Sequence, residues 1–361
     1  MSPAATLLIA IAVCVVLTAI ALALTANGRR GRHTGSRAVQ ASSSDAPQEP
    51  APAPPRAAIV VNPTKFPDLD EVRRSLDVAA QELGWAPPVF LLTTQDDPGA
   101  GQAADAIEDK VDLVCSLGGD GTVRMVATAL AGTDTPLGLL PGGTGNLLAR
   151  NLDLPYGDVV ESFRIACTGS ERAVDVGYLT LDPEDTRAPG EEHAFLVMAG
   201  IGLDATIMAE TSEAAKAKIG WPAYAATGLR NFLGPRLRAT VTIDGGQPEA
   251  VHAHTVLVGN CGRITGGLNL IPDALVDDGV LDVVVVAPRT LIGWLEVLAR
   301  VLTQHRGERN KRLQRHTGTQ VQITTPQPQA VQLDGDVIGD ATRVSVRIAP
   351  SALRVRVPSA A

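Results

Sequence analysis

Two stretches of the sequence decide the fold: Leu117-Gly118-Gly119-Asp120-Gly121-Thr122 and Leu139-Leu140-Pro141-Gly142-Gly143-Thr144-Gly145-Asn146. Each is a short apolar run that ends in glycines. Glycine has no Cβ and tolerates positive φ, so the backbone at these points can lie directly against a ligand. Two such turns side by side present main-chain N–H groups, which suit phosphate oxygens. The sequence therefore predicts a nucleoside triphosphate site that is not a P-loop, because no GxxxxGK[ST] pattern occurs.

Both glycine turns lie in a repeat of apolar strands and amphipathic helices. We expect strands at residues 57–61, 89–93, 111–117 and 137–140, and helices at 68–83, 100–109, 122–131 and 146–151. Short apolar strands that alternate with helices indicate a parallel sheet with right-handed crossovers. Ligands of such sheets bind beyond the carboxyl ends of the strands. Asn62, Thr94 and the two glycine turns all follow strands, so we expect them to meet in one crevice.

The second half of the chain has a different pattern. Short runs of β-type residues, separated by turn residues such as Asp244-Gly245-Gly246, indicate antiparallel strands. We expect them at residues 174–181, 194–198, 238–243, 253–258, 281–286, 320–324, 330–333 and 344–348. The sequence therefore predicts an α/β domain followed by a domain rich in antiparallel strands.

Composition and charge narrow the class of protein. The 361 residues allow two domains, and 45% of them are hydrophobic while only 3% are aromatic, so aliphatic side chains must build the core. The net charge of −8 argues against nucleic-acid binding. The four cysteines, Cys14, Cys115, Cys167 and Cys261, are far apart, which favours reduced, buried thiols over a disulfide framework or a zinc site.

The N-terminal region carries the pattern of a membrane anchor. Residues 4–26 are 23 uncharged, mostly aliphatic residues, enough to span a hydrocarbon core of about 30 Å. Arginines follow this segment and no Lys or Arg precedes it, so the positive-inside rule predicts a single-pass anchor with the catalytic part in the cytoplasm. The competing interpretation is a cleaved signal peptide with an unusually long apolar region. Residues 38–56, rich in Ala, Ser, Pro and Gln, are typical of a flexible linker.

The order and spacing of the motifs resemble those of the diacylglycerol kinase catalytic family, which includes bacterial lipid kinases and the sphingosine and ceramide kinases. The resemblance covers about residues 57–358, which is nearly everything after the linker. The motifs that carry it are Asn62-Pro63 and residues 118–122, 141–146, 200–205, 272–282 and 332–336. A Gly-Gly-Asp-Gly turn also occurs in NAD kinases and phosphofructokinases, whereas the Pro-Gly-Gly-Thr-Gly-Asn run distinguishes the lipid kinases.

The resemblance implies an NAD kinase-like α/β architecture, in which a parallel-sheet nucleotide domain is followed by an antiparallel β-sandwich. The chain then divides into a transmembrane signal anchor at residues 1–27, a disordered linker at 28–56, an ATP-binding α/β domain at 57–169 and a β-sandwich lipid-substrate domain at 170–361. In the family the last strands can return to the first domain, and periodicity leaves this open here.

The resemblance also implies which residues bind the nucleotide. By position, the residues expected to contact ATP are Asn62, Pro63, Thr64, Lys65, Phe66, Thr94, Gly118, Gly119, Asp120, Gly121, Thr122, Val123, Arg124 and Thr144. This sequence departs from the family pattern in two places. Arg124 and Met125 occupy positions where the family often has Asn and Glu, and Phe66 replaces a usual glycine. Arg124 would add positive charge near the phosphates.

Two acidic residues are the candidates for catalysis. The resemblance implies that Asp120 holds a catalytic Mg²⁺ between the β- and γ-phosphates, directly or through water. Asp336 aligns with the family's proton acceptor, which is usually Glu, and Asp334 is the second candidate for that role. The alternative for residues 334–336 is a plain hairpin turn.

A further Mg²⁺ site is implied in the second domain. Asp278, with the main-chain oxygens of Leu275 and Val280, resembles a structural metal site that braces this domain rather than touching phosphate. The alternative is an acidic turn at residues 277–279, because Asp-Gly is common in turns.

The function that the resemblance implies is transfer of the γ-phosphate of ATP to a lipid hydroxyl, with diacylglycerol as the first candidate and Mg²⁺ as cofactor. The expected partners are ATP, a membrane lipid and the membrane, but no nucleic acid. Two alternatives stay open: phosphorylation of NAD or another non-lipid acceptor by the same superfold, and a nucleotide or lipid sensor without catalysis. Neither the acceptor alcohol nor the oligomeric state follows from the sequence.

Overall fold

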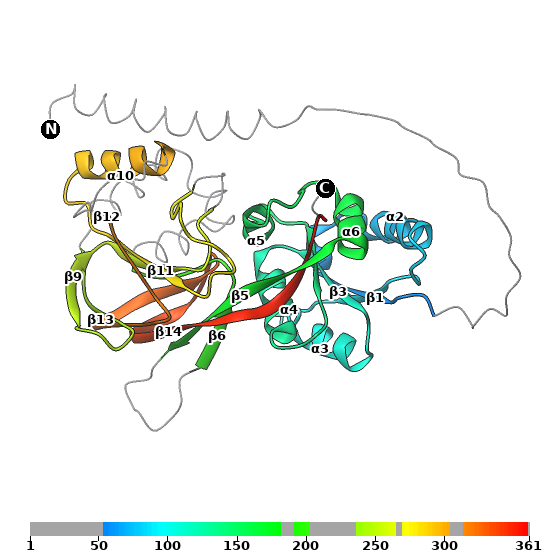
Figure 1. Ribbon diagram of the computed structural model, residues 1–361, viewed down its shortest axis with the longest axis horizontal. Helices are drawn as coiled ribbons and strands as arrows, with labels where there is room; N and C mark the ends of the chain where they lie inside the picture. Colours follow the sequence, from blue (N-terminus) through cyan, green and yellow to red (C-terminus); the bar gives the residue numbers. More distant parts are fainter. Residues whose placement is uncertain (1–52, 182–190, 203–235, 265–268, 304–312, 360–361) are drawn as a thin grey trace, which may run out of the picture. The chain divides into compact units, whose positions relative to one another are not determined.

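A computed structural model describes residues 53–181, 191–202, 236–264, 269–303 and 313–359 (Figure 1). The chain divides into two units, residues 1–53 and residues 54–361. The second unit holds all of the helices and strands described here.

Four parallel strands form the N-terminal part of the sheet. They are β1 (Ala57–Val61), β2 (Val89–Leu92), β3 (Leu113–Gly118) and β4 (Leu137–Pro141), in the order β2-β1-β3-β4. Every residue of β1, β3 and β4 is buried, as expected for parallel strands that are covered on both faces. Alternate residues of β1 belong to two different hydrophobic clusters, one on each side of the sheet.

Two pairs of helices cover the two faces of these strands (Figure 1). On one face lie α2 (Leu69–Glu82) and α6 (Val159–Thr168), and on the other lie α3 (Ala100–Glu108) and α4 (Asp120–Leu130). Both α2 and α6 start after an aspartate, Asp68 and Asp158, whose carboxylate accepts a main-chain N–H of the first turn. Two shorter helices, η1 (Pro63–Lys65) and α5 (Leu147–Asn151), follow β1 and β4 at the carboxyl edge of the sheet.

The C-terminal part is antiparallel. Its strands are β5 (Ser170–Leu181), β6 (Glu191–Phe195), β7 (Met198–Gly202), β8 (Leu237–Ile243), β9 (Glu249–Ala253), β10 (Thr255–Gly259), β11 (Leu281–Val286), β12 (Leu313–Gly318), β13 (Gln320–Leu333) and β14 (Asp336–Val357). Helix α10 (Leu291–Thr303) follows β11. The strands pair in the order β12-β11-β10-β7-β13-β14, while β8 pairs with β13 and β9 pairs with β8. Alternate residues of these strands share one apolar core, as in a sandwich.

The last strand joins the two parts of the sheet. β14 pairs with β13 over its first half and with β5 over most of its length. A register shift between Ala349 and Leu353, with Ser351 at a φ of 52°, bends the strand. Beyond this bend Val355 pairs in parallel with Leu137 of β4, so the end of the chain returns to the α/β part.

Some elements differ from those expected. Residues 194–198 were expected to form one strand, but β6 ends at Phe195 and β7 begins at Met198. The main-chain N–H groups of Leu196 and Val197 donate to the carboxylate of Asp334, a side chain from a distant turn, which interrupts the strand. Helix α6 was not expected at all, because its Val and Ile residues lower helix propensity.

The membrane anchor is the main correction to the expected fold. In the part of the chain that the structure describes, no helix combines the length and the apolar character needed to cross a membrane. This finding corrects two predictions, the transmembrane helix in the fold and the single-pass membrane location with a cytoplasmic catalytic part. The predicted segment itself, residues 4–26, and the linker up to residue 52 lie outside the described residues.

Candidate functional site

The two glycine turns lie against each other at the carboxyl ends of β3 and β4. The N–H of Gly142 donates to the carbonyl oxygen of Gly118 at 2.9 Å. A Cβ placed on Gly143 would lie 2.7 Å from the Cα of Gly119, closer than such atoms approach in proteins. A side chain is therefore excluded at Gly143, and its bare main chain faces that of Gly119.

Helix α4 begins at the first of these turns. Gly119 is its N-cap and makes no side-chain capping bond. The first N–H groups of a helix and the positive end of its dipole attract anions. The side chains of Thr122 and Val123 are buried against the domain core, so a ligand at this helix end would meet their main-chain atoms.

Asp120 links the first glycine turn to the second. Its two carboxylate oxygens accept the N–H groups of Asn146, at 2.9 Å, and Leu147, at 2.6 Å. These are the first N–H groups of α5, so Asp120 caps that helix across the turn. Gly145 must lack a side chain, because its Cβ would collide with the Asp120 carboxylate. Burial raises the pKa of the Asp120 carboxyl and the charge of Asp336 adds to this, whereas the two N–H bonds lower it.

Asn146 shapes the second turn, a role that was not predicted from the sequence. Its side chain accepts the N–H of Gly143 at 3.1 Å and donates to the Gly143 carbonyl oxygen at 2.8 Å. Its backbone is left-handed, with a φ of 49°. One feature of the sequence could have indicated this role: an asparagine, which tolerates the left-handed conformation, stands between a glycine run and a predicted helix.

The Asn62 turn lies beside both glycine turns. The N–H of Asn62 donates to the carbonyl oxygen of Leu117 at 3.0 Å, and its side chain accepts the N–H of Thr64 at 3.1 Å. The ring of Phe66 occupies the space that a side chain on Gly142 would need. This turn, which includes Pro63 and Lys65 in η1, is thus fitted to the second glycine turn.

Two other predicted nucleotide contacts, Thr94 and Thr144, are exposed. Thr94 follows β2, and its hydroxyl accepts the N–H of Asp97 at 3.0 Å. The same loop reaches α4, since a Cβ on Gly99 would lie 3.6 Å from the carbonyl oxygen of Thr122. Thr144 is exposed in the second glycine turn. All four predicted strand-end segments therefore lie along the carboxyl edge of the parallel strands.

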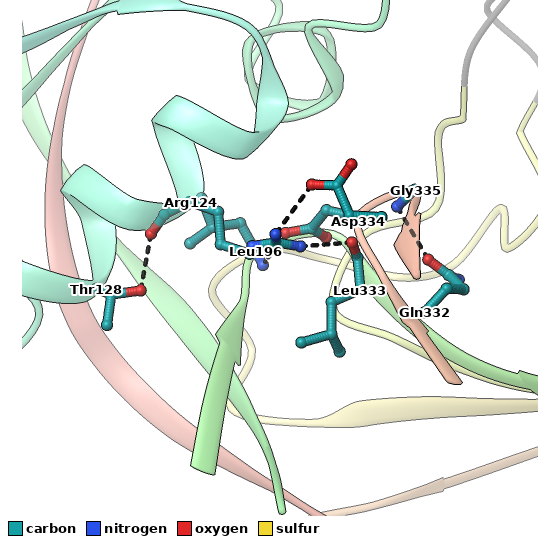
Figure 2. Close-up of polar contacts among 8 residues, drawn as sticks. Arg124, Thr128, Leu196, Gln332, Leu333, Asp334 and Gly335 are labelled. Atoms are coloured by element: carbon teal, nitrogen blue, oxygen red, sulfur yellow. Dashed lines mark hydrogen bonds and ion pairs between the residues drawn. The ribbon is translucent and has the colours of Figure 1, made fainter. Parts of the chain in front are cut away.

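The turn between β13 and β14, at Asp334 and Gly335 (Figure 2), brings an acid to the first glycine turn. Asp334 and Gly335 both have positive φ, 49° and 100°, the pattern of a tight two-residue hairpin. Asp336 follows directly, and one of its carboxylate oxygens would lie 3.2 Å from a Cβ on Gly121. The same oxygen accepts a hydrogen bond from the Arg124 guanidinium at 2.9 Å. The Asp336 side chain is 57% exposed.

Asp334 has a different environment from Asp336. Its carboxylate is buried and accepts the N–H groups of Leu196, Val197 and Met198 at 2.9, 2.8 and 3.0 Å. Burial raises the pKa of the Asp334 carboxyl, while these N–H groups and the charge of Arg124 lower it. Its hydrogen bonds hold the segment between β6 and β7, so Asp334 does not fit the role of second candidate for proton acceptor.

The predicted structural metal site is a tight acidic turn. The Asp278 carboxylate accepts the N–H of Val280 at 3.1 Å, and burial raises the pKa of this carboxyl. The buried carboxylate of Asp175 accepts the N–H of Gly279 at 2.6 Å. Within the described ranges, no three or more His, Cys, Asp or Glu side chains are grouped so that they could hold a metal ion. Mg²⁺ at Leu275, Asp278 and Val280 stays a prediction.

Two family models match the chain, one over each part of this fold. The diacylglycerol kinase catalytic domain matches residues 56–179, and the YegS C-terminal NAD kinase beta sandwich-like domain matches residues 196–357. A probable YegS-like lipid kinase of Pseudomonas fluorescens is 32% identical over 311 residues, which cover 84% of this chain and 96% of that protein. A probable YegS-like lipid kinase of Yersinia enterocolitica is 30% identical over 253 residues, or 69% of this chain and 79% of that protein.

The chain belongs to the YegS-type lipid kinase family and carries a diacylglycerol kinase catalytic domain. It is a kinase, and its family implies ATP as the phosphate donor. Among solved structures, a putative diacylglycerol kinase from Bacillus anthracis has the same fold, with a TM-score of 0.65 and 23% identity over 83% of this chain and 96% of that one. The α/β fold with a C-terminal β-sandwich is thus confirmed for the kinase.

Proposed function

We propose that this kinase transfers the γ-phosphate of ATP to the hydroxyl of a membrane lipid, with diacylglycerol as the first candidate, giving phosphatidic acid and ADP. The curated relatives are named as probable lipid kinases, which supports a lipid acceptor. The choice of diacylglycerol rests on the catalytic-domain match alone. We propose that the reaction takes place between the carboxyl edge of the parallel strands and the hairpin turn at Asp336.

The observation that carries the proposal is the contact between Asp336 and the first glycine turn. The Asp336 side chain is exposed, and one of its carboxylate oxygens would lie 3.2 Å from a Cβ on Gly121. Because Gly121 has no side chain, its main chain can approach a triphosphate directly. Phosphoryl transfer asks the protein chiefly for positioning and charge stabilisation. In the proposed step Asp336 accepts the proton of the lipid hydroxyl, the hydroxyl oxygen bonds to the γ-phosphorus, and the bond from that phosphorus to the β–γ bridging oxygen breaks as ADP leaves.

The nucleotide would lie along the residues already described. We propose that the main-chain groups of the two glycine turns and the N-terminus of α4 bind the phosphates, flanked by the Asn62 turn and Thr94. Mg²⁺ is usually bound by one or two carboxylates together with substrate phosphates. Asp120, in the first glycine turn, fits this requirement. Each Asp120 oxygen accepts one N–H and keeps a second lone pair for an ion or its water. The ion would neutralise charge on the β- and γ-phosphates.

The test is transfer from γ-labelled ATP to a panel of acceptors in mixed micelles: diacylglycerol, monoacylglycerol, ceramide and sphingosine, with NAD as a soluble acceptor. We expect label in phosphatidic acid, and Asp336→Asn should lower kcat by roughly 10²-fold or more, since it removes the proton acceptor. Asp340→Asn is the matched control, because Asp340 is an exposed acid further along β14.

Three results would overturn the proposal. Label in NAD alone would favour a non-lipid kinase of the same fold. Nucleotide binding without transfer to any acceptor would favour a sensor. An Asp336→Asn protein as active as Asp340→Asn would remove Asp336 from the reaction.

A further inference from the structure

We infer that Arg124 is a positioning residue that holds Asp336 at the first glycine turn, and that its guanidinium serves this acid rather than the nucleotide. The inference deepens the proposed function and rests on it. It replaces the expectation that Arg124 contacts ATP, which was drawn from its place next to the Gly-Gly-Asp-Gly turn.

The guanidinium of Arg124 bonds to both sides of the hairpin turn (Figure 2). One nitrogen donates to the carbonyl oxygen of Leu333, the last residue of β13, at 2.6 Å. The other donates to the carboxylate of Asp336, the first residue of β14, at 2.9 Å. Leu333 and Asp336 are the pair that closes the turn. A planar guanidinium suits such paired acceptors, because its donors have a fixed fork geometry.

Arg124 is itself well placed to act as a fixed support. It lies in the first half of α4, three residues after Gly121, and its carbonyl oxygen accepts the hydroxyl of Thr128 at 2.8 Å. Its side chain is 13% exposed, against 57% for Asp336. The arginine is therefore the more buried partner, and the acid that it orients is the exposed one.

The hairpin turn is also anchored within the sandwich. Asp334 accepts three main-chain N–H groups from the segment between β6 and β7, and the side chain of Gln332 accepts the N–H of Gly335 at 2.9 Å. These bonds fix the turn within the sandwich but do not reach α4. Among the bonds described, those of Arg124 are the ones that connect this turn to the helix that begins at the glycine turn.

Electrostatics gives a reason for this arrangement. The charge of Asp336 already acts on Asp120, and a bound triphosphate would add more negative charge at the same helix end. An uncompensated carboxylate at Asp336 would be repelled from the γ-phosphate region. The Arg124 cation offsets this repulsion, and its hydrogen bond keeps the aspartate, which has a single methylene, directed at the glycine turn.

A double-mutant cycle tests the inference with wild type, Arg124→Gln, Asp336→Asn and the double variant. For each protein we would measure kcat and KM for ATP at saturating lipid, the Kd of a fluorescent ATP analogue and the melting temperature. Arg124→Gln should lower kcat by about 10²-fold, the scale of a misplaced catalytic group, while the KM and Kd for nucleotide change by less than about threefold. In the Asp336→Asn background the same substitution should change kcat by less than about threefold, because the group that it positions is already gone.

Two further variants keep the outcome interpretable. Arg124→Lys keeps the charge but not the fork, so it should also lower kcat, and it serves if Arg124→Gln does not fold. Arg347→Gln is the matched control. Arg347 lies further along β14 and forms an exposed ion pair with Glu192 of β6, so its loss should leave kcat unchanged.

The outcomes separate this inference from the proposed function. A raised KM and Kd for nucleotide with kcat preserved would make Arg124 a phosphate ligand and overturn the inference. Losses of kcat that multiply in the double variant would show that Arg124 and Asp336 act independently, with the same consequence. No transfer by wild type to any lipid, or full activity of Asp336→Asn, would instead overturn the proposed function.

Discussion

At the scale of single residues, the site depends on glycines, which have no side chain. Gly143 is the clearest case, because a Cβ there would lie 2.7 Å from the Cα of Gly119. The backbone of neither turn can yield without moving a strand end, since Gly142 and Gly118 are hydrogen-bonded. The close approach of the two turns is therefore a steric requirement for glycine at this position.

Substitution of Gly143 by alanine should separate the turns and weaken nucleotide binding. We expect the Kd of a fluorescent ATP analogue to rise by about tenfold or more, equivalent to about 1.4 kcal/mol, with a parallel loss of activity. The matched control is Gly132→Ala, where φ is +79° but nothing lies within 4 Å of the added Cβ. That variant should lose only about 1 kcal/mol of stability. Unchanged nucleotide affinity in Gly143→Ala would contradict the prediction.

At the scale of elements, α5 shows a helix that depends on its surroundings. Five residues are too few for a stable helix in isolation. Its first N–H groups are capped by Asp120, and at its other end the side chain of Asn151 bonds to the main chain of Arg263 in the sandwich part. Helix α5, which directly follows the second glycine turn, is thus held at both ends by polar contacts with other parts of the chain.

Asp120→Asn should destabilise this arrangement as well as lower activity. The asparagine keeps one oxygen acceptor and places an NH₂ donor opposite the second N–H, so one buried donor loses its partner. We expect the free energy of unfolding to fall by about 1–3 kcal/mol, measured by urea denaturation. The loss of activity alone would also follow from loss of a metal ligand, so stability is the deciding measurement. An unchanged denaturation midpoint would contradict the capping role.

The elements themselves were predictable to different degrees. The strands and helices of residues 57–151 follow from the periodicity of their apolar residues, and most of their observed bounds lie close to those expected. The break between β6 and β7 did not follow, because the carboxylate of Asp334, 138 residues away from Leu196, takes the N–H that would have continued the strand. Residues 320–333, expected as two strands, form the single strand β13 with a register shift in its middle.

At the scale of the whole described unit, the candidate site combines a local part and a distant part. The glycine turns meet because both follow neighbouring parallel strands, which is a property of topology that the sequence pattern reveals. The contact of Arg124 with Asp336 joins residues 212 apart in the sequence. Periodicity carries no information about such a contact, and only the family resemblance directed attention to Asp336.

The return of β14 has a consequence for folding. The cluster around Leu137 includes α/β residues such as Val126 together with Val174, Leu353 and Val355 from the C-terminal part. Leu353 and Val355 are fully buried. Two parts that share one core are expected to lose it together, so residues 54–361 should unfold in a single cooperative transition.

Two single-tryptophan proteins can test this, one keeping Trp85 in the α/β part and one keeping Trp294 on α10, with phenylalanine at the other tryptophan positions. We expect their fluorescence transitions in urea to coincide. Leu353→Ala should lower both midpoints together, at a cost of about 2–5 kcal/mol, because it opens a cavity in the shared core. Val337→Ala, at a 40% exposed site on the same strand, is the control and should cost far less. A different outcome would contradict this prediction: Leu353→Ala could lower the urea midpoint reported by Trp294 and leave the midpoint reported by Trp85 unchanged. The two parts would then unfold independently, and β14 would cover the α/β core without coupling it to the sandwich.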